Sequence, residues 1–213
     1  MKYIKIIILP ILILITSIII LITNIPHLEY QYSEEYEGYL ITKAVGNAEY
    51  YNVPNYYKDK PVVGISENAF NGHSNLKEIE LPSNLYFIGR MSFNECVNLE
   101  RINLENVEEI ERNAFSYCSN LKELNINAKY IGASCFYKCK NLENINLKNT
   151  ISIGDMCFSN TTIKTISIPK TCTYLGNDSF YECYTLKEIN VYSKYLKNNT
   201  YLNSLAIVNY IGN

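Results

Sequence analysis

The sequence predicts an α/β repeat fold: a solenoid of about six coils of 21–23 residues each, with a parallel β-sheet along one face and a transmembrane helix in front of it. Three observations support this prediction. An uncharged apolar run lies near the N-terminus, a phenylalanine recurs at a nearly constant interval, and a short apolar–polar alternation follows each of these phenylalanines. Self-similarity at a period of about 20–50 residues is typical of proteins in which each unit buries its apolar face against its neighbours.

The apolar run covers residues 6–22 and contains fourteen Ile or Leu among seventeen residues, without a charge. With its flanks it approaches the ~20 residues that a helix needs to cross a bilayer. Lys2 and Lys5 precede it and an acidic stretch follows, so the positive-inside rule places the N-terminus in the cytoplasm and the rest of the chain outside. The run is longer than the apolar part of a cleavable signal peptide, and no pair of small residues follows it. We therefore favour an uncleaved signal-anchor over a cleaved signal.

Six phenylalanines mark the repeat, at intervals of 23, 22, 21, 22 and 22 residues. They are Phe70, Phe93, Phe115, Phe136, Phe158 and Phe180. An Ile or Leu precedes each Phe by five residues, and another follows it by six residues in every unit but the fifth, which is one residue shorter there. A pair of apolar residues separated by one position comes next. Six units that agree at all these positions predict six stacked coils.

Each unit divides into a strand half and a turn half. In the first unit the segment LKEIEL alternates, so Ile79 and Leu81 should point inward and Glu78 and Glu80 outward from a short strand. The segment around Phe70 should form a single helical turn, which places the Phe and the residue three positions later on one side. In four of the six units a glycine precedes this turn, where the chain has to change direction. Stacked coils would align the six Phe side chains in one buried column behind the sheet.

The chain has seven cysteines, an odd number. Cys135 and Cys139 form a C-x3-C motif that would suit a metal ion on a helical turn. Both, however, occupy repeat positions, one before and three after the Phe, which other units also fill with small residues. The remaining cysteines lie at these two positions or at an apolar one: Cys96, Cys118, Cys157, Cys172 and Cys183. A buried free cysteine behaves as a small apolar residue, so we expect no metal or redox site and favour stacked free thiols over disulfides, which an extracytoplasmic location would permit.

Two segments carry a family resemblance. IERNAFSYCSNLKELNI (residues 110–126) and LGNDSFYECYTLKEINV (residues 175–191) closely follow the unit of the BspA-like leucine-rich repeats, which the chain resembles over about residues 38–192. Departures are local: Glu111 stands where the family has Gly, and a Pro follows the strand in only two units. The resemblance implies a right-handed, curved leucine-rich-repeat solenoid of the kind found on cell surfaces, where it binds other proteins or matrix.

The resulting organisation has five parts. They are a cytoplasmic tip and membrane span (residues 1–25), an acidic spacer (26–37), an N-terminal β cap with a turn at Gly46 (38–64), the repeats (65–192) and a C-terminal cap that ends with a further strand (193–213). The lead-in to the repeats is similar to the capping segment that usually precedes them in the family.

The outward positions of the strands form two polar columns, and these are the candidate ligand-binding residues. One column is Glu78, Arg101, Glu123, Asn144, Thr165 and Glu188, and the other is Glu80, Asn103, Asn125, Asn146, Ser167 and Asn190. Acid and base alternate at the start of the first column, and the asparagines of the second could form an amide ladder. A solvated sheet face without a ligand is the simpler interpretation, and a binding surface is the alternative.

Other classes of function have little support in the sequence. The formal net charge is −2, so nothing indicates nucleic-acid binding. The chain has only two histidines: His73 occupies a repeat position that other units fill with Cys, and His27 lies beside the apolar run. No catalytic residues, cofactor site or metal site are predicted, and no phosphate-binding motif occurs. The remaining alternative from a different functional class is an enzyme with an unrecognised active site. His73 would be the residue to test for it.

We therefore predict a membrane-anchored, extracytoplasmic protein of the cell surface that binds a protein or matrix ligand through its sheet face. Its partners would be the membrane, through the N-terminal helix, and that ligand, and self-association is a further option. The alternative is a structural protein of the cell envelope without a specific soluble ligand.

Overall fold

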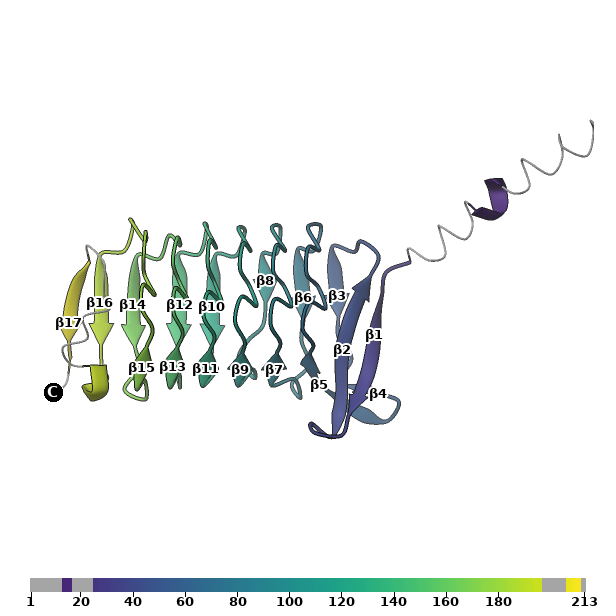
Figure 1. Cartoon of the computed structure of the whole chain (residues 1–213), viewed down its shortest axis with the longest axis horizontal. Coiled ribbons are helices and arrows are strands. Elements are labelled where there is room, and N and C mark those ends of the chain that lie inside the picture. The colour runs from purple at the N-terminus through teal and green to yellow at the C-terminus, as the bar shows by residue number, and fades with distance from the viewer. Residues whose placement is uncertain (1–12, 17–24, 197–205, 212–213) are drawn as a thin grey trace, which may run out of the picture.

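The computed structural model describes residues 13–16, 25–196 and 206–211. It shows a β-solenoid of about seven turns with coils of about 22 residues, stacked along one axis from β1 at one end to β17 at the other (Figure 1). Two ladders of parallel strands follow this axis, and buried side chains from both form the core. The predicted solenoid is confirmed, with about one turn more than predicted.

The first ladder consists of the strands that the apolar–polar alternation predicts, and we call its outer side the long-strand face. Its strands are β3 (Tyr50–Asn52), β6 (Glu78–Glu80), β8 (Arg101–Ile102), β10 (Glu123–Ile126), β12 (Asn144–Leu147), β14 (Thr165–Ile168), β16 (Glu188–Val191) and β17 (Ile207–Tyr210). They pair in three parallel groups, β3-β6-β8, β10-β12 and β14-β16-β17. As predicted, Ile79 and Leu81 are buried and Glu80 is exposed.

The second ladder is a row of very short strands that the sequence does not predict. It contains β5 (Lys60–Ile65), β7 (Phe87–Ile88), β9 (Glu109–Ile110), β11 (Tyr130–Ile131), β13 (Ser152–Ile153) and β15 (Tyr174–Leu175). These strands form one parallel sheet that continues through β2 (Gly38–Val45) to the antiparallel β1 (His27–Ser33), while β4 (Tyr56–Tyr57) pairs antiparallel with β5. Most of these strands have only two residues, which is too short for a periodicity to be recognised.

The turn half of each coil is not helical, so the predicted α/β class is wrong: the described residues are nearly all strand and turn. The residues two positions before and after the phenylalanine have a positive φ, for example Ser134 (54°) and Lys138 (59°) around Phe136. A left-handed residue ends a right-handed helical turn, so two of them within five residues exclude a helix. The backbone N–H groups of all three residues instead donate to carbonyls of the next coil at 2.8–3.0 Å.

The six phenylalanines of the repeat form the predicted column. Each is at most 1% exposed, and neighbouring ring centroids are 4.9–5.7 Å apart with interplanar angles of at most 14°. Tyr51 closes the first end of the column edge-on, 5.5 Å from Phe70, and its hydroxyl donates to the Val45 carbonyl at 3.1 Å. Stacked aromatic pairs of this kind each stabilise a fold by about 0.5–1.5 kcal/mol beyond the burial of their area.

The glycines before the turns allow close packing between coils rather than a change of direction. A Cβ at Gly132 would lie 2.3 Å from the backbone nitrogen of Arg112, and one at Gly176 would lie 2.3 Å from that of Asp155. Glu111 replaces this glycine in the third coil, and its carboxylate accepts a hydrogen bond from the backbone N–H of Arg90 at 2.7 Å. Glycine is therefore needed at this repeat position where the backbones of two neighbouring coils come too close for a Cβ atom.

All seven cysteines are free and buried, as favoured from the sequence. They do more than fill space, because the thiols of Cys96, Cys118 and Cys139 each donate to the carbonyl of the Phe in the preceding coil at 3.1 Å. Burial raises the pKa of every one of these thiols, to about 11 for Cys172 and to about 12 for Cys96. The thiols are therefore uncharged structural donors at neutral pH.

The N-terminal region differs from the predicted organisation. Residues 26–37, predicted as a spacer, contain β1, which pairs with β2. The chain turns at Gly46 (φ 84°) as expected, but β2 and β3 on either side of this turn join different ladders, so the cap region 38–64 is itself a solenoid turn. At the other end, β17 is the predicted last strand and pairs parallel with β16.

The predicted transmembrane helix lies almost entirely outside the described residues. Of residues 1–25 the structure describes a helical stretch at residues 13–16 and Ile25. Among the described residues, no helix has the length and apolar character that spanning a bilayer requires.

Replacing Phe115 with Ala should lower the free energy of unfolding by about 3–5 kcal/mol, because the change opens a cavity between Phe93 and Phe136. Urea denaturation followed by circular dichroism measures this loss. Phe87→Ala is the matched control, since Phe87 is partly exposed and stacks on Tyr36 outside the column. Equal losses in both variants would mean that the column has no special role in stability.

The free energy of unfolding should fall as the pH rises above about 9. The unfolded chain then releases thiol protons that the folded chain retains, since all seven folded-state pKa values are raised, and each fully buried thiol contributes up to about 1.4 kcal/mol per pH unit. Denaturant midpoints at pH 7, 9 and 10 under reducing conditions measure the effect. Replacing Cys139 and Cys157 with Ser should flatten the dependence; an unchanged slope would assign the loss to other groups.

Candidate functional site

The twelve predicted binding residues lie on the long-strand face, in successive rows. The first column pairs Glu78 with Arg101, Glu123 with Asn144, and Thr165 with Glu188 across neighbouring strands. The second pairs Asn125 with Asn146 and Ser167 with Asn190. Three of the twelve side chains are partly buried, namely Glu78, Asn103 and Asn190, and the other nine are exposed.

A groove of about 890 Å³ opens on this face across β6, β8, β10 and β12, and we call it the long-strand groove. Seven of the predicted residues line it: Glu78, Glu80, Arg101, Asn103, Glu123, Asn125 and Asn144. The other five, Asn146, Thr165, Ser167, Glu188 and Asn190, lie beyond it. Ile102, which is partly exposed, provides apolar surface in the groove, while Ile79 lies beneath it with its side chain in the core. The structure therefore gathers the first half of the two columns into one site and leaves the second half on an open sheet face.

The groove lies where the long-strand ladder is interrupted. In the described part of the chain, the groups β3-β6-β8 and β10-β12 meet only through a single bridge between Leu104 and Ile126. Strand β8 ends at Ile102, and the next side chain, Asn103, bonds to the backbone of Leu81: Oδ1 accepts from its N–H at 2.7 Å and Nδ2 donates to its carbonyl at 2.9 Å. This amide takes the place of a backbone partner for Leu81, so regular pairing between β6 and β8 ends at Ile102.

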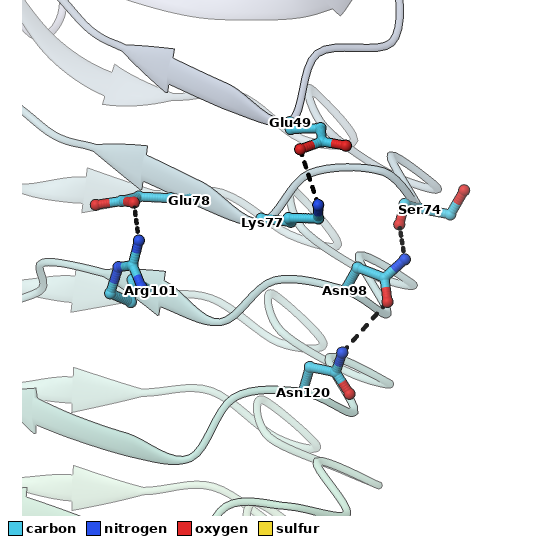
Figure 2. A network of polar contacts seen from close by, with 7 residues as sticks. All are labelled: Glu49, Ser74, Lys77, Glu78, Asn98, Arg101 and Asn120. Atoms are coloured by element: carbon cyan, nitrogen blue, oxygen red, sulfur yellow. Dashed lines mark hydrogen bonds and ion pairs between the residues drawn. The ribbon is translucent and has the colours of Figure 1, made fainter.

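Ion pairs link coils at the edge of the face, as Figure 2 shows for the first coils. The Arg101 guanidinium pairs with Glu78, and Lys77 Nζ lies 2.8 Å from Glu49 Oε2. Hydrogen bonding to Arg101 holds the pKa of the Glu78 carboxyl below its ordinary value. The predicted alternation of charge thus produces an ion pair between Glu78 and Arg101, whereas Glu123 is not among the described ion-pair partners of Arg101.

The predicted amide ladder forms only in part. Asn146 Nδ2 donates to Asn125 Oδ1 at 3.4 Å, whereas Asn103 bonds to backbone instead. A second amide ladder was missed: Asn120 Nδ2 donates to Asn98 Oδ1 at 3.2 Å, and Asn98 Nδ2 donates to the Ser74 carbonyl at 2.7 Å (Figure 2). An Asn-Leu dipeptide that recurs in four units was the available signal for it.

Four further charged residues of the groove were also missed. They are Glu100, Glu105, Lys122 and Glu143. All but Glu105 belong to a column in which acid and base alternate just before each strand: Glu49, Lys77, Glu100, Lys122, Glu143 and Lys164. This alternation is visible in the sequence, but it lies outside the strand positions on which the prediction concentrated.

Residues with chemical potential lie away from the groove. His73 is partly buried against the Phe70 ring, and its Nε2 is buried without a hydrogen-bond partner among the described residues. Cys135 and Cys139 are fully buried between coils. Within the described ranges, no three His, Cys, Asp or Glu side chains come together in a way that could hold a metal ion. The long-strand groove itself is lined mainly by carboxylates, amides and two basic side chains.

Coils of about 22 residues, each with a polar outward strand and a buried Leu and Phe, define a leucine-rich-repeat solenoid. The family model that matches is described as a BspA type leucine rich repeat region, in six copies, over residues 47–151 and 126–211. The chain belongs to this family, which confirms the resemblance seen in the sequence. No curated protein matches the chain.

Several solved structures share the fold. A leucine-rich repeat protein of T. pallidum is 23% identical, with a TM-score of 0.59, and the match covers 76% of this chain and 68% of that one. A leucine-rich cell surface protein of Faecalibacterium prausnitzii A2-165 is 21% identical (TM-score 0.60; 80% and 55%), and the pneumococcal vaccine antigen PcpA is 18% identical (0.59; 80% and 49%). The chain thus spans about half the length of the last two proteins.

Replacing Arg101 with Gln should return the pKa of the Glu78 carboxyl towards its ordinary, higher value, because the lowered pKa depends first on the hydrogen bond from Arg101. An NMR pH titration of the Glu78 side chain measures this shift. Lys129→Gln, which removes the exposed ion pair with Glu108 elsewhere, is the control and should leave Glu78 unaffected. An unchanged Glu78 pKa in the Arg101 variant would contradict the assigned cause.

Proposed function

We propose that this chain is a binding module of the cell surface, which captures a protein or matrix ligand on its long-strand face. The observation that carries the proposal is the long-strand groove, because it coincides with the part of the face where outward polar residues of four successive coils converge. Its volume of about 890 Å³ is within the range of ligand sites, ~300–1,000 Å³. Its polar walls suit a polypeptide better than an apolar small molecule.

We further propose that the module acts outside the cytoplasm and is held at the membrane by the apolar run of residues 6–22. The two lysines before this run and the acidic stretch after it support that orientation. The cell-surface description of the F. prausnitzii protein, which has the same fold, is consistent with this placement.

Ligand capture, rather than turnover, is the activity that the groove supports. Its described lining residues include no histidine, cysteine or serine, so that set lacks a Ser or Cys nucleophile paired with a histidine base. What they offer is hydrogen bonding, charge and the apolar surface of Ile102, which together suit recognition.

Replacing Asn125 with Trp should abolish capture of a partner, because the bulky indole would project into the groove and obstruct it whatever the chemistry of the ligand. The test is affinity capture from host-matrix and cell-envelope proteins, with the chain of residues 1–213 held in a detergent micelle as bait. Gln31→Trp is the matched control: it also replaces an exposed strand amide, but on β1, away from the groove.

The thermal unfolding midpoints of both variants should stay close to that of the parent chain, since both positions are exposed. A saturable partner that is lost with Asn125→Trp and kept with Gln31→Trp would establish the recognition surface. A partner that the Asn125 variant still captures would refute the groove as the site. Absence of any partner from a folded bait would favour the structural envelope role.

A further inference from the structure

We propose that the occupant of the long-strand groove is a short, extended, positively charged segment of a polypeptide, with lysine or arginine side chains directed at the groove's unpaired carboxylates. This inference rests on the proposed function and specifies the chemistry of its partner. It follows from the charge balance of the groove, from its length across the coils and from the interruption of the ladder beneath it.

The charge balance is strongly acidic on a chain of nearly neutral composition. Six carboxylates line the groove, namely Glu78, Glu80, Glu100, Glu105, Glu123 and Glu143, against two basic side chains, Arg101 and Lys122. Two of the carboxylates are already paired, Glu78 with Arg101 and Glu143 with Lys164. The net charge of the whole chain is only −2, so this surface is a local concentration of negative charge.

Four carboxylates therefore remain without an ion pair among the described residues. Glu80 accepts a hydrogen bond from the neutral Tyr50 hydroxyl at 3.2 Å, and Glu100, Glu105 and Glu123 are exposed without a salt bridge. Lys122 is the basic side chain left to balance them, and it also acts on Glu143, whose carboxyl pKa is lowered mainly by its hydrogen bond with Lys164 and to a smaller extent by the charge of Lys122. Complementary charge on a partner would be attracted to this surface and oriented by it.

The arrangement fits a polypeptide better than a metal ion. The four carboxylates are distributed over three coils, and within the described part of the chain no group of three acidic, His or Cys side chains converges on a metal-sized space. From β6 to β12 there are three strand spacings, about 14 Å, which is the length of roughly four extended residues. The partly exposed Ile102 adds apolar surface that the stem of a Lys or Arg side chain can cover.

The interrupted ladder adds backbone groups to the same surface. Elsewhere on this face a backbone N–H in front of the strand donates to the preceding coil, as Glu100 does to Lys77 and Glu143 to Lys122, both at 2.8–2.9 Å. The corresponding bond between Lys122 and Glu100 is missing from the described contacts, since the two strand groups meet only at Leu104 and Ile126. A peptide backbone in the groove would find hydrogen-bonding groups there, as well as charge.

Binding of a defined peptide tests the inference. The probe is an acetylated and amidated peptide of four Lys-Ala repeats, and the comparison peptide has four Ser-Ala repeats. Fluorescence anisotropy with the chain of residues 1–213 should give saturable binding of the first peptide that weakens as sodium chloride is raised from about 50 to about 500 mM, because exposed charges are screened. The Ser-Ala peptide should bind at least about tenfold more weakly.

A matched pair of triple variants separates the groove from the overall charge. Glu100→Gln, Glu105→Gln and Glu123→Gln together should weaken Lys-Ala binding by about tenfold or more. The control replaces three exposed carboxylates outside the groove, Glu29, Glu34 and Glu95, with Gln; it removes the same charge and should change binding less than about twofold. If the groove triple variant does not fold, Asn125→Trp provides the equivalent loss.

Three results would overturn the inference. The first is equal binding of the two peptides, and the second is equal weakening of binding by the two triple variants. The third is displacement of the Lys-Ala peptide by millimolar calcium at constant ionic strength, which would assign the carboxylates to a divalent cation. The proposed function is tested separately. Suppose that the chain captures a native partner, that Asn125→Trp abolishes this capture, and that the Lys-Ala peptide does not bind. This result would support the recognition surface and reject only its preference for positive charge.

Discussion

The structure depends on one constraint: the backbone of each coil has to follow that of its neighbour at a single strand spacing around almost the whole circumference. The hydrogen bonds between coils impose this spacing in both ladders and also in the turns, where the left-handed residues around each phenylalanine direct N–H groups along the axis. This spacing explains three features of the core. The phenylalanine rings stack, Gly132 leaves room for the backbone of the neighbouring coil, and the Cys118 thiol is close enough to bond to a carbonyl of the preceding coil.

Most of the repeat could be predicted because its signals are local and recur. The Phe period located the column, and the alternation around Ile79 located the outward residues of the first ladder. The second ladder could not be predicted, since a strand of two residues has no recognisable period. The non-helical conformation of the turns could not be predicted either, because residues with a positive φ, such as Lys138, are not of a type that indicates this conformation. The N-terminal region was predicted incorrectly for a related reason. Strand β1 pairs with β2, and β2 pairs in turn with β5 of the next coil, and neither pairing can be recognised from a local sequence pattern.

The candidate site shows the same limit more sharply. Asn103, Asn125 and Asn146 occupy equivalent repeat positions and look interchangeable in the sequence, yet Asn103 binds the backbone of Leu81 while the other two bind each other. That difference in side-chain partner lies on the coil of β8, beside the interruption between β8 and β10 over which the groove opens. In a repeat protein such a site becomes visible only in three dimensions, where equivalent positions of successive coils take different partners.

The hydrogen bonds that run along the axis also determine how the molecule would bear mechanical load. A pull along the axis stretches these bonds one coil at a time, whereas a pull across it loads the bonds of a whole ladder together. A ligand held in the groove and a tether at the N-terminal end would place the tension on the coils from β1 to β12, and those from β14 onward would carry none (Figure 1). The end of the aromatic column that Tyr51 closes lies within the loaded part, so tension would act on the coils that contain this contact.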